Sequence, residues 1–240
     1  MKKAALWVAI AGIALAGTAA AQEESSSPHK FAFTAAITSD YVFRGVSQNQ
    51  EDPAIQGGVT YSHESGFYAG VWGSAVDFTP DNADYDDGAD MEVDTFIGYN
   101  WGINEDWKLD LQFIRYNYPG TEDGYDYDYN ELLTKIIFKE NYSLLVGYSN
   151  DVFATDETGI YYGLSGSWEL PHEFILSATL GHYDLDDSYD HSYTETVLGV
   201  KRTWGHFTVA LSYSDTSGGG EDIFGKLADD RVILTLSADF

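Results

Sequence analysis

Charged residues at every second position are the feature of this sequence that could do chemistry. In an extended strand alternate side chains point to the same face, so Glu92 and Asp94 share one face of their segment. The same parity assigns a common face to a larger set of ionisable residues: Asp40, Arg44, Glu92, Asp94, Asp110, Glu131, Lys135, Glu169, Glu195, Lys201 and Arg231. Acids outnumber bases in this set, and such a surface attracts cations and repels anions.

Residue combinations for covalent catalysis are sparse. The chain has no Cys and six His. His191 beside Asp187 and Asp190 is the one protease-like combination, and His182, on which a lipase-like site would depend, has no evident Ser partner. The acidic stretch 79–88 does not match a calcium-binding loop and is predicted to be a solvated surface, with weak divalent binding as the alternative. We therefore predict no catalytic residue, no metal site and no cofactor.

The overall charge and the N-terminus limit partners and compartment. The chain carries 12 basic and 39 acidic side chains, a net charge of −27, which argues strongly against nucleic acid as a partner. A positive start, an apolar run over 4–17 and small residues before Ala21 are the three parts of a secretory signal. We predict a signal peptide over 1–21, a flexible leader over 22–29 and one folded domain over 30–240.

The elements that must position the charged face are strands. From residue 30 onward the chain alternates apolar and polar residues, and no segment has a convincing helical period. The links after even-numbered strands are short, and those after odd-numbered strands tend to be longer and acidic, which is typical of a closed transmembrane β-barrel with tight periplasmic turns. Twelve antiparallel strands are predicted, over 30–47, 53–62, 66–78, 89–101, 106–118, 126–138, 141–152, 158–169, 172–184, 192–204, 206–215 and 229–240.

Aromatic residues flank the short links. A soluble β-sandwich would share the alternation but has no reason to place aromatic rings beside every second turn. Rings at one level on all strands form a girdle at the boundary between membrane and water. The final Phe240, after alternating apolar residues over 232–238, resembles the signal read by the outer-membrane barrel-assembly machinery. The predicted girdle consists of Trp101, Trp107, Trp168, Trp204, Phe207 and Phe240.

A barrel in lipid must bond all its backbone groups internally, so the charged face is expected to line its lumen. The sequence leaves open whether this lumen is a wet pore or pocket, or is plugged by charges that pair across it. Asp40 and Arg44 on a regular strand would lie about 13 Å apart, so partners on neighbouring strands are expected. The first strand could also bend at Ser39 and Asp40 into two pieces. Trp72 joins Tyr68 on the inner face, either as a constriction or as ordinary filling.

Three stretches in the N-terminal third carry a family resemblance. They are SDYVFRGVSQ over 39–48, DPAIQGG over 52–58 and HESGFYAG over 63–70, with weaker likeness at 131–132, 148–149, 211–215 and 228–232. They resemble the TorF-type family of proteobacterial outer-membrane porins. The resemblance implies an outer-membrane barrel of the porin class and names no substrate.

These features predict an outer-membrane channel for the passive diffusion of small hydrophilic solutes, with a preference for cations. The expected partners are outer-membrane lipid and lipopolysaccharide, the barrel-assembly machinery, and small solutes or cations. A non-conducting structural or adhesive barrel and an enzyme built on a barrel are the alternatives.

Overall fold

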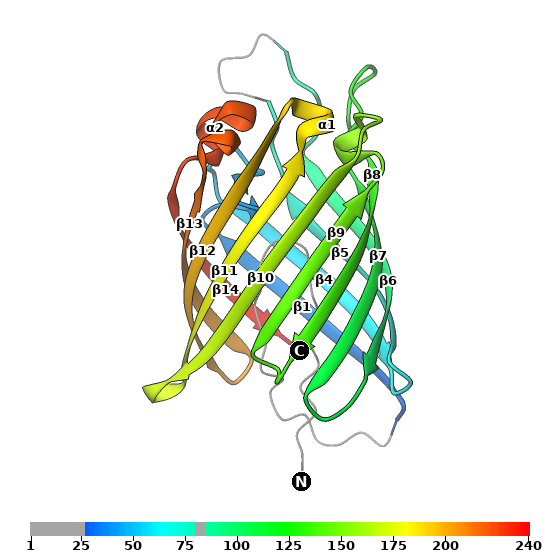
Figure 1. Ribbon diagram of the computed structural model, residues 1–240, viewed down its shortest axis with the longest axis vertical. Coiled ribbons are helices and arrows are strands. Elements are labelled where there is room, and N and C mark those ends of the chain that lie inside the picture. Colours follow the sequence, from blue (N-terminus) through cyan, green and yellow to red (C-terminus); the bar gives the residue numbers. More distant parts are fainter. Residues whose placement is uncertain (1–26, 80–84) are drawn as a thin grey trace.

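The chain forms a closed antiparallel β-barrel (Figure 1). The computed structural model describes residues 27–79 and 85–240, so the predicted signal peptide and residues 22–26 of the leader lie outside the described residues. Twelve strands of the described residues make the barrel, as the sequence predicts. They are β1 (His29–Thr38), β4 (Ala54–His63), β5 (Phe67–Ala75), β6 (Met91–Gly102), β7 (Trp107–Asn117), β8 (Tyr129–Phe138), β9 (Tyr142–Ser149), β10 (Gly159–Leu170), β11 (Phe174–Leu185), β12 (His191–Trp204), β13 (Phe207–Thr216) and β14 (Arg231–Asp239).

The barrel closes where β1 pairs with β14. Thr34 lies opposite Asp239, and Thr38 lies opposite Thr235. Phe240 extends this seam, because its N–H donates to the carbonyl of Phe33 and its carbonyl accepts from the N–H of Phe33, both at 2.9 Å. A sheet closed in this way leaves no row of unpaired backbone groups, which a strand-built structure in lipid requires.

Side chains alternate between the lumen and the outside along the strands. On β6, for example, Glu92 and Asp94 are buried, whereas Met91 and Ile97 are exposed. Soluble proteins rarely expose a continuous apolar surface, whereas barrels surrounded by lipid do. The exposed outer band includes Leu111, Phe113, Leu132, Leu144, Leu164, Leu180, Leu198, Leu211 and Leu234.

The predicted girdle residues lie on the outside of the barrel. Trp101 and Trp107 flank the link between β6 and β7, and Trp204 and Phe207 flank the link between β12 and β13. The exposed set comprises Trp101, Trp107, Trp168, Trp204, Phe207 and Phe240. These rings therefore stand next to the short turns at one end of the barrel.

The other end of the barrel carries longer links and short helices. In Figure 1 the helices α1 (Asp186–Tyr189) and α2 (Gly218–Phe224) lie at the upper end, opposite the short turns. Among the described residues, the longer links also contain the 3-10 turns η1 (Val152–Ala154) and η3 (Gly225–Ala228), whereas η2 (Pro171–Glu173) forms the short link between β10 and β11. The sequence predicts no helix, because one or two turns are too short to establish a helical period. Within the described part of the chain, no helix is long and apolar enough to cross a membrane.

The first predicted strand is wrong beyond Thr38. The prediction runs over 30–47, whereas β1 ends at Thr38 and the chain then turns into the barrel, as the alternative bend at Ser39 and Asp40 allows. Residues 39–53, called here the inward segment, contain the short strands β2 (Val42–Phe43) and β3 (Val46–Ser47). A strand of about 9–11 residues already spans a membrane, so the predicted strand is longer than it needs to be. The other eleven strands begin and end within three residues of their predicted bounds.

Candidate functional site in the barrel lumen

The inward segment is a tight hairpin inside the barrel. β2 pairs with β3 so that Arg44 and Gly45 form a two-residue turn. Both have positive φ, 48° and 84°, which is the conformation of the type I′ turns that favour two-residue hairpins. Every residue from 40 to 47 is buried. The hairpin is therefore enclosed by the barrel rather than displayed as an outer loop.

Gly45 lets the tip of the hairpin approach the barrel wall closely. A Cβ atom at this position would lie 2.5 Å from Cγ2 of Thr216 and 3.2 Å from Cβ of Glu195. Its φ also lies in the region that favours glycine. The tip consequently rests against β12 and β13 at a distance that a larger residue cannot adopt without displacement.

Arg44 carries the contacts of the hairpin across the lumen. Its Nη2 atom forms an ion pair with Oε1 of Glu131 on β8, at 2.7 Å. Its guanidinium carbon lies 4.2 Å from the ring centre of Tyr161 and 4.6 Å from that of Tyr183, in cation–π contact. Its backbone carbonyl accepts a hydrogen bond from the hydroxyl of Tyr193, at 2.8 Å. Strands β8, β10, β11 and β12 therefore all hold this one residue.

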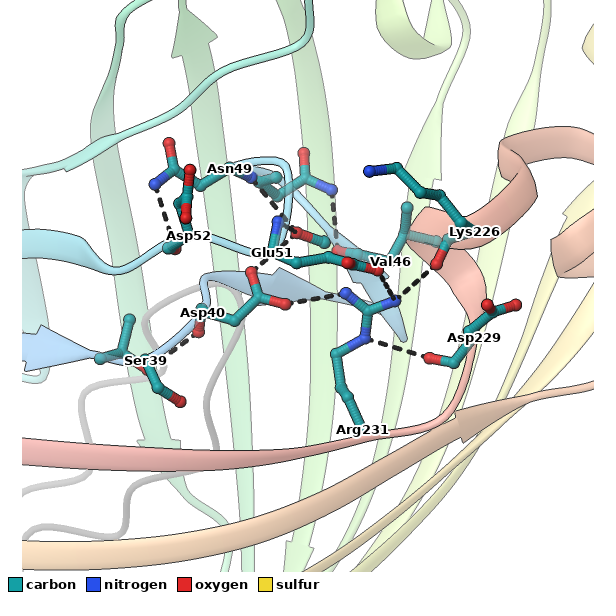
Figure 2. Close-up of polar contacts among 12 residues, drawn as sticks. Ser39, Asp40, Val46, Asn49, Glu51, Asp52, Lys226, Asp229 and Arg231 are labelled. Carbon is teal, nitrogen blue, oxygen red and sulfur yellow. Dashed lines mark hydrogen bonds and ion pairs between the residues drawn. The ribbon is translucent and has the colours of Figure 1, made fainter. Parts of the chain in front are cut away.

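Asp40 anchors the start of the inward segment to the closing strand (Figure 2). Its Oδ2 atom lies 2.8 Å from Nη1 of Arg231 on β14, and its Oδ1 atom accepts a 2.7 Å hydrogen bond from Ser47. Arg231 also donates to the backbone carbonyls of Lys226 and Asp229. Burial raises the pKa of the Asp40 carboxyl, and the hydrogen bonds from Arg231 and Ser47 oppose that shift.

Aromatic rings pack on both sides of the hairpin. The hydroxyl of Tyr41 donates to Oε1 of Glu92 at 3.1 Å, and its ring meets Trp72 edge-on, with ring centres 5.5 Å apart. The ring of Phe43 lies 6.0 Å from that of Tyr116. The second side is a buried cluster that contains Val46, Val152, Tyr161, Tyr183, Leu185 and Tyr193. The hairpin and these rings together fill this part of the lumen.

Phe153 of η1 covers the packed region from the link between β9 and β10. Its ring centre lies 5.3 Å from that of Tyr129 and 6.1 Å from that of Tyr183. It also meets Phe224 of α2 at 6.4 Å. Phe153 thus packs on the aromatic cluster from the end of the barrel with the longer links and contacts rings of β8, β11 and α2.

The lumen lining changes toward the short turns. The hydroxyl oxygens of Ser165 and Thr179 lie 2.9 Å apart on neighbouring strands. On β10 to β12 the inner residues here are small and half-buried: Ser165, Ser167, Ser177, Thr179 and Val197. A cavity lies against the inner faces of β1, β4 and β5, lined in part by Ala32, Thr34, Gly58, Thr60 and Trp72. The lining of β10 to β12 is therefore made of smaller and less buried side chains than the region around the hairpin.

The structure places the predicted lumen residues as follows. Lys135 is half-buried with Asp110 as its charged neighbour, and Asp110 accepts a 2.8 Å hydrogen bond from Tyr68. Glu169 is exposed near the end of β10. Asp40 and Arg44 belong to the hairpin, and Arg231 is paired with Asp40. The strand residues that are buried in the lumen are Trp72, Glu92, Asp94, Asp110, Glu131, Glu195 and Lys201.

Sequence reasoning from charge alone misses the tyrosines of the lumen. On the barrel strands the most enclosed are Tyr116, Tyr129, Tyr161, Tyr183 and Tyr193, none of them more than 4% exposed. They occupy the same parity as the charged residues, as Tyr193 does with Glu195. A parity argument applied to aromatic as well as charged residues would identify them, although not the ring that each one meets.

The two histidines considered as possible catalytic residues, His191 and His182, are exposed and have only long polar contacts. Nε2 of His191 lies 3.7 Å from Oδ2 of Asp222, with both side chains about half exposed or more. His182 is exposed and lies 3.4 Å from the hydroxyl of Thr194. Among the residues that the structure describes, no group of three or more His, Cys, Asp or Glu is arranged to hold a metal ion. Asp81 and Asp84 of the acidic stretch lie outside those residues.

Comparison with known families now places the chain. A family model described as a bacterial protein of unknown function (Gcw_chp) matches residues 22–240. The chain belongs to this family. No curated protein matches the chain.

Two solved structures of porins share the barrel. A KdgM porin is 5% identical, with 88% of this chain and 97% of that chain covered and a TM-score of 0.52. A NanC porin is 8% identical, with 88% and 99% covered and a TM-score of 0.54. At such low identity the likeness establishes the common barrel fold.

Proposed function

We propose that this protein is a porin-like channel of the bacterial outer membrane that lets small hydrophilic solutes diffuse passively, with a preference for cations. The observation that carries the proposal is the contrast between the two faces of the closed barrel. The outside is an apolar band with an aromatic girdle, and the inside carries an excess of acidic groups. The porin folds of KdgM and NanC and the resemblance to TorF-type porins support the same class.

Several features support the outer membrane as the location. The N-terminal sequence has the form of a cleaved signal peptide that ends near Ala21. Phe240 closes the barrel seam against Phe33, and the alternating apolar residues of β14 are what the barrel-assembly machinery would read. The proposed partners are outer-membrane lipid, lipopolysaccharide at the acidic loops, that machinery, and small solutes or cations.

The acidic lumen supports the preference for cations. Six buried carboxylates face the lumen or lie on the hairpin within it, Asp40, Glu92, Asp94, Asp110, Glu131 and Glu195. The bases among the predicted lumen residues are Arg44, Lys135, Lys201 and Arg231. An excess of negative charge in a confined space of low dielectric raises the local concentration of cations and excludes anions.

A non-conducting barrel is the second candidate, and the inward segment favours it. The pairs Arg44–Glu131 and Asp40–Arg231 fix the hairpin across the lumen. If the hairpin never moves, the channel is closed at this level. Whether the hairpin narrows or blocks the path is therefore the point on which the two functions differ.

Single-channel conductance in planar bilayers separates the two functions. The matched variant replaces residues 39–53 by a two-residue Asn-Gly turn, because Thr38 and Ala54 lie opposite each other and a two-residue link can join them. The channel proposal expects conductance in the natural protein, a larger conductance in the variant, and cation selectivity in both. The variants Glu92→Gln and Asp94→Asn should reduce that selectivity.

Three outcomes contradict the channel proposal in different ways. Anion selectivity would refute the role of the lumen carboxylates. Silence of the natural protein at all voltages, with conductance in the shortened variant, would mean that the hairpin is a permanent plug. Silence of both proteins would make the barrel structural.

A further inference from the structure

Glu92 and Asp94 form a buried acidic pair near one end of β6. β6 begins at Met91, where the chain returns from the long acidic link, so both carboxylates lie near the barrel end opposite the short turns. The two residues are only 2% and 1% exposed. Residues two apart on a strand share a face with Cα atoms about 7 Å apart, so the two carboxylates project into the same part of the lumen.

The other lumen acids near the hairpin have cationic partners. Glu131 is paired with Arg44 at 2.7 Å, and Asp40 is paired with Arg231 at 2.8 Å. Both arginines of the region are therefore engaged with these other carboxylates.

Asp94 has no such partner. Neither of its carboxylate oxygens has a hydrogen-bond partner among the described residues. Its charged neighbours are two acids, Glu92 and Glu131. Glu92 accepts a hydrogen bond from the hydroxyl of Tyr41, a neutral donor. The pair therefore lies buried without a basic partner, and when both groups are ionised its two negative charges are not balanced by any cationic side chain named here.

A buried carboxylate without a counter-charge is costly, and an ion that binds there removes the cost. We propose that Glu92 and Asp94 bind a divalent cation of the calcium class. One divalent ion balances the two carboxylates, and the free oxygens of Asp94 are available to it as ligands. The site goes beyond the proposed channel, because it can bind an ion whether or not the lumen conducts.

The chemistry of the surroundings selects the class of ion. The chain has no thiol, and the groups around the pair are carboxylate and phenol oxygens with the indole of Trp72 opposite Asp94. Oxygen ligands suit hard cations, and calcium tolerates irregular coordination completed by water better than magnesium does. With two carboxylates rather than the larger sets of dedicated sites, we expect a dissociation constant of roughly 10⁻⁴–10⁻³ M.

Terbium luminescence tests the site directly. Tb³⁺ replaces Ca²⁺ at oxygen sites, and Trp72, which lies opposite Asp94 on β5, would sensitise its emission on excitation of the indole. The folded protein in detergent should give sensitised emission that added Ca²⁺ displaces. Asp94→Asn and Glu92→Gln should weaken Tb³⁺ binding by about tenfold or more, since each removes one of two charged ligands.

A surface acid provides the control. Asp123 is exposed in the link between β7 and β8, and Asp123→Asn should leave the emission unchanged. Emission that is equal in the natural protein and in Asp94→Asn overturns the site and leaves the pair as a carboxyl and a carboxylate that share a proton. An equal loss in Asp123→Asn also overturns it, because the binding would then reflect the general surface charge.

Thermal unfolding of the natural protein gives a second readout that depends on no variant. Millimolar Ca²⁺ should raise the unfolding temperature relative to the chelated protein, and the increase should be absent in any variant of the pair that folds. No change with Ca²⁺ overturns the proposal. A protein that binds Ca²⁺ but never conducts refutes the channel and leaves the ion site standing, so the two failures are distinguishable.

Discussion

The two ends of the lumen are built differently, although the same strands line both. Around the inward segment the lumen is filled, with Arg44 held by four strands and every residue from 40 to 47 buried. Toward the short turns on β10 to β12, the lining consists of small residues that are half-buried, such as Ser165 and Thr179. The filled end depends on particular partners, whereas the lining of β10 to β12 near the short turns consists of small residues without charged partners.

This difference predicts where the barrel tolerates change. A side chain in close packing with a specific ion pair loses both packing and electrostatics when it is altered. A half-buried hydroxyl can exchange its protein partner for water at little cost. Substitutions should therefore lower the free energy of unfolding more at the filled end than on β10 to β12 near the short turns.

The largest effect is expected for Arg44→Ala. It leaves the carboxylate of Glu131 buried without its partner and removes the contacts with Tyr161 and Tyr183. Loss of one member of a buried pair costs about 3–5 kcal/mol. Urea unfolding in detergent, followed by tryptophan fluorescence, measures this loss.

The double variant Arg44→Ala with Glu131→Gln is the matched control. It also removes the buried charge and should recover part of the stability that the single variant loses. A loss below about 1 kcal/mol in Arg44→Ala would mean that the hairpin is held loosely, and it would remove the contrast between the two ends.

A smaller effect is expected for Gly45→Ala, with Gly102→Ala as its control. Gly45 has a φ of 84°, and its Cβ would meet Thr216 at 2.5 Å, so the cost should be about 1–3 kcal/mol. Gly102 lies at the short-turn end of β6 with nothing within 4 Å of a Cβ, so its substitution should change stability by about 0.5 kcal/mol or less. Equal losses in the two variants, measured by the same unfolding curves, would contradict the contrast.

Two tyrosines at the filled end allow the contribution of a specific hydrogen bond to be distinguished from that of ring packing. The hydroxyl of Tyr193 donates to the carbonyl of Arg44, so Tyr193→Phe should cost about 1 kcal/mol. The buried hydroxyl of Tyr183 has no hydrogen-bond partner among the described residues, so Tyr183→Phe should be neutral or slightly stabilising. The order of the two unfolding midpoints decides this prediction, and the reverse order would contradict it.

The barrel fold can be predicted from local patterns in the sequence. The alternation within strands, the aromatic rings beside the short links and the alternating link lengths predict twelve strands, and eleven of them have nearly the bounds found. These signals are local, because each depends on residues two apart or on the residues that flank one turn. Local patterns of this kind can be read without knowing which strands meet.

The inward segment could be predicted only in part. A first strand of 18 residues exceeds the length that spans a membrane, and the adjacent apolar residues Val42 and Phe43 break the alternation, so a bend was foreseeable. The partners of Arg44 could not be predicted, because Glu131 lies 87 positions away in the chain and contacts Arg44 only across the closed lumen. Contacts across a lumen depend on the curvature of the whole barrel, which no local pattern encodes.

The smallest effect is expected where the lining is loose. Ser165→Ala and Thr179→Val each remove one side of the hydroxyl contact between β10 and β11. Because both residues are half-buried, water can satisfy the remaining hydroxyl, and the unfolding free energy should change by about 0.5 kcal/mol or less. A loss above about 1 kcal/mol would show that this hydroxyl pair is as specific as the bond between Tyr193 and Arg44. The lining of β10 and β11 near the short turns would then depend on specific partners as well. The hairpin region would differ from it in the size of the side chains that fill the lumen, not in the specificity of their contacts.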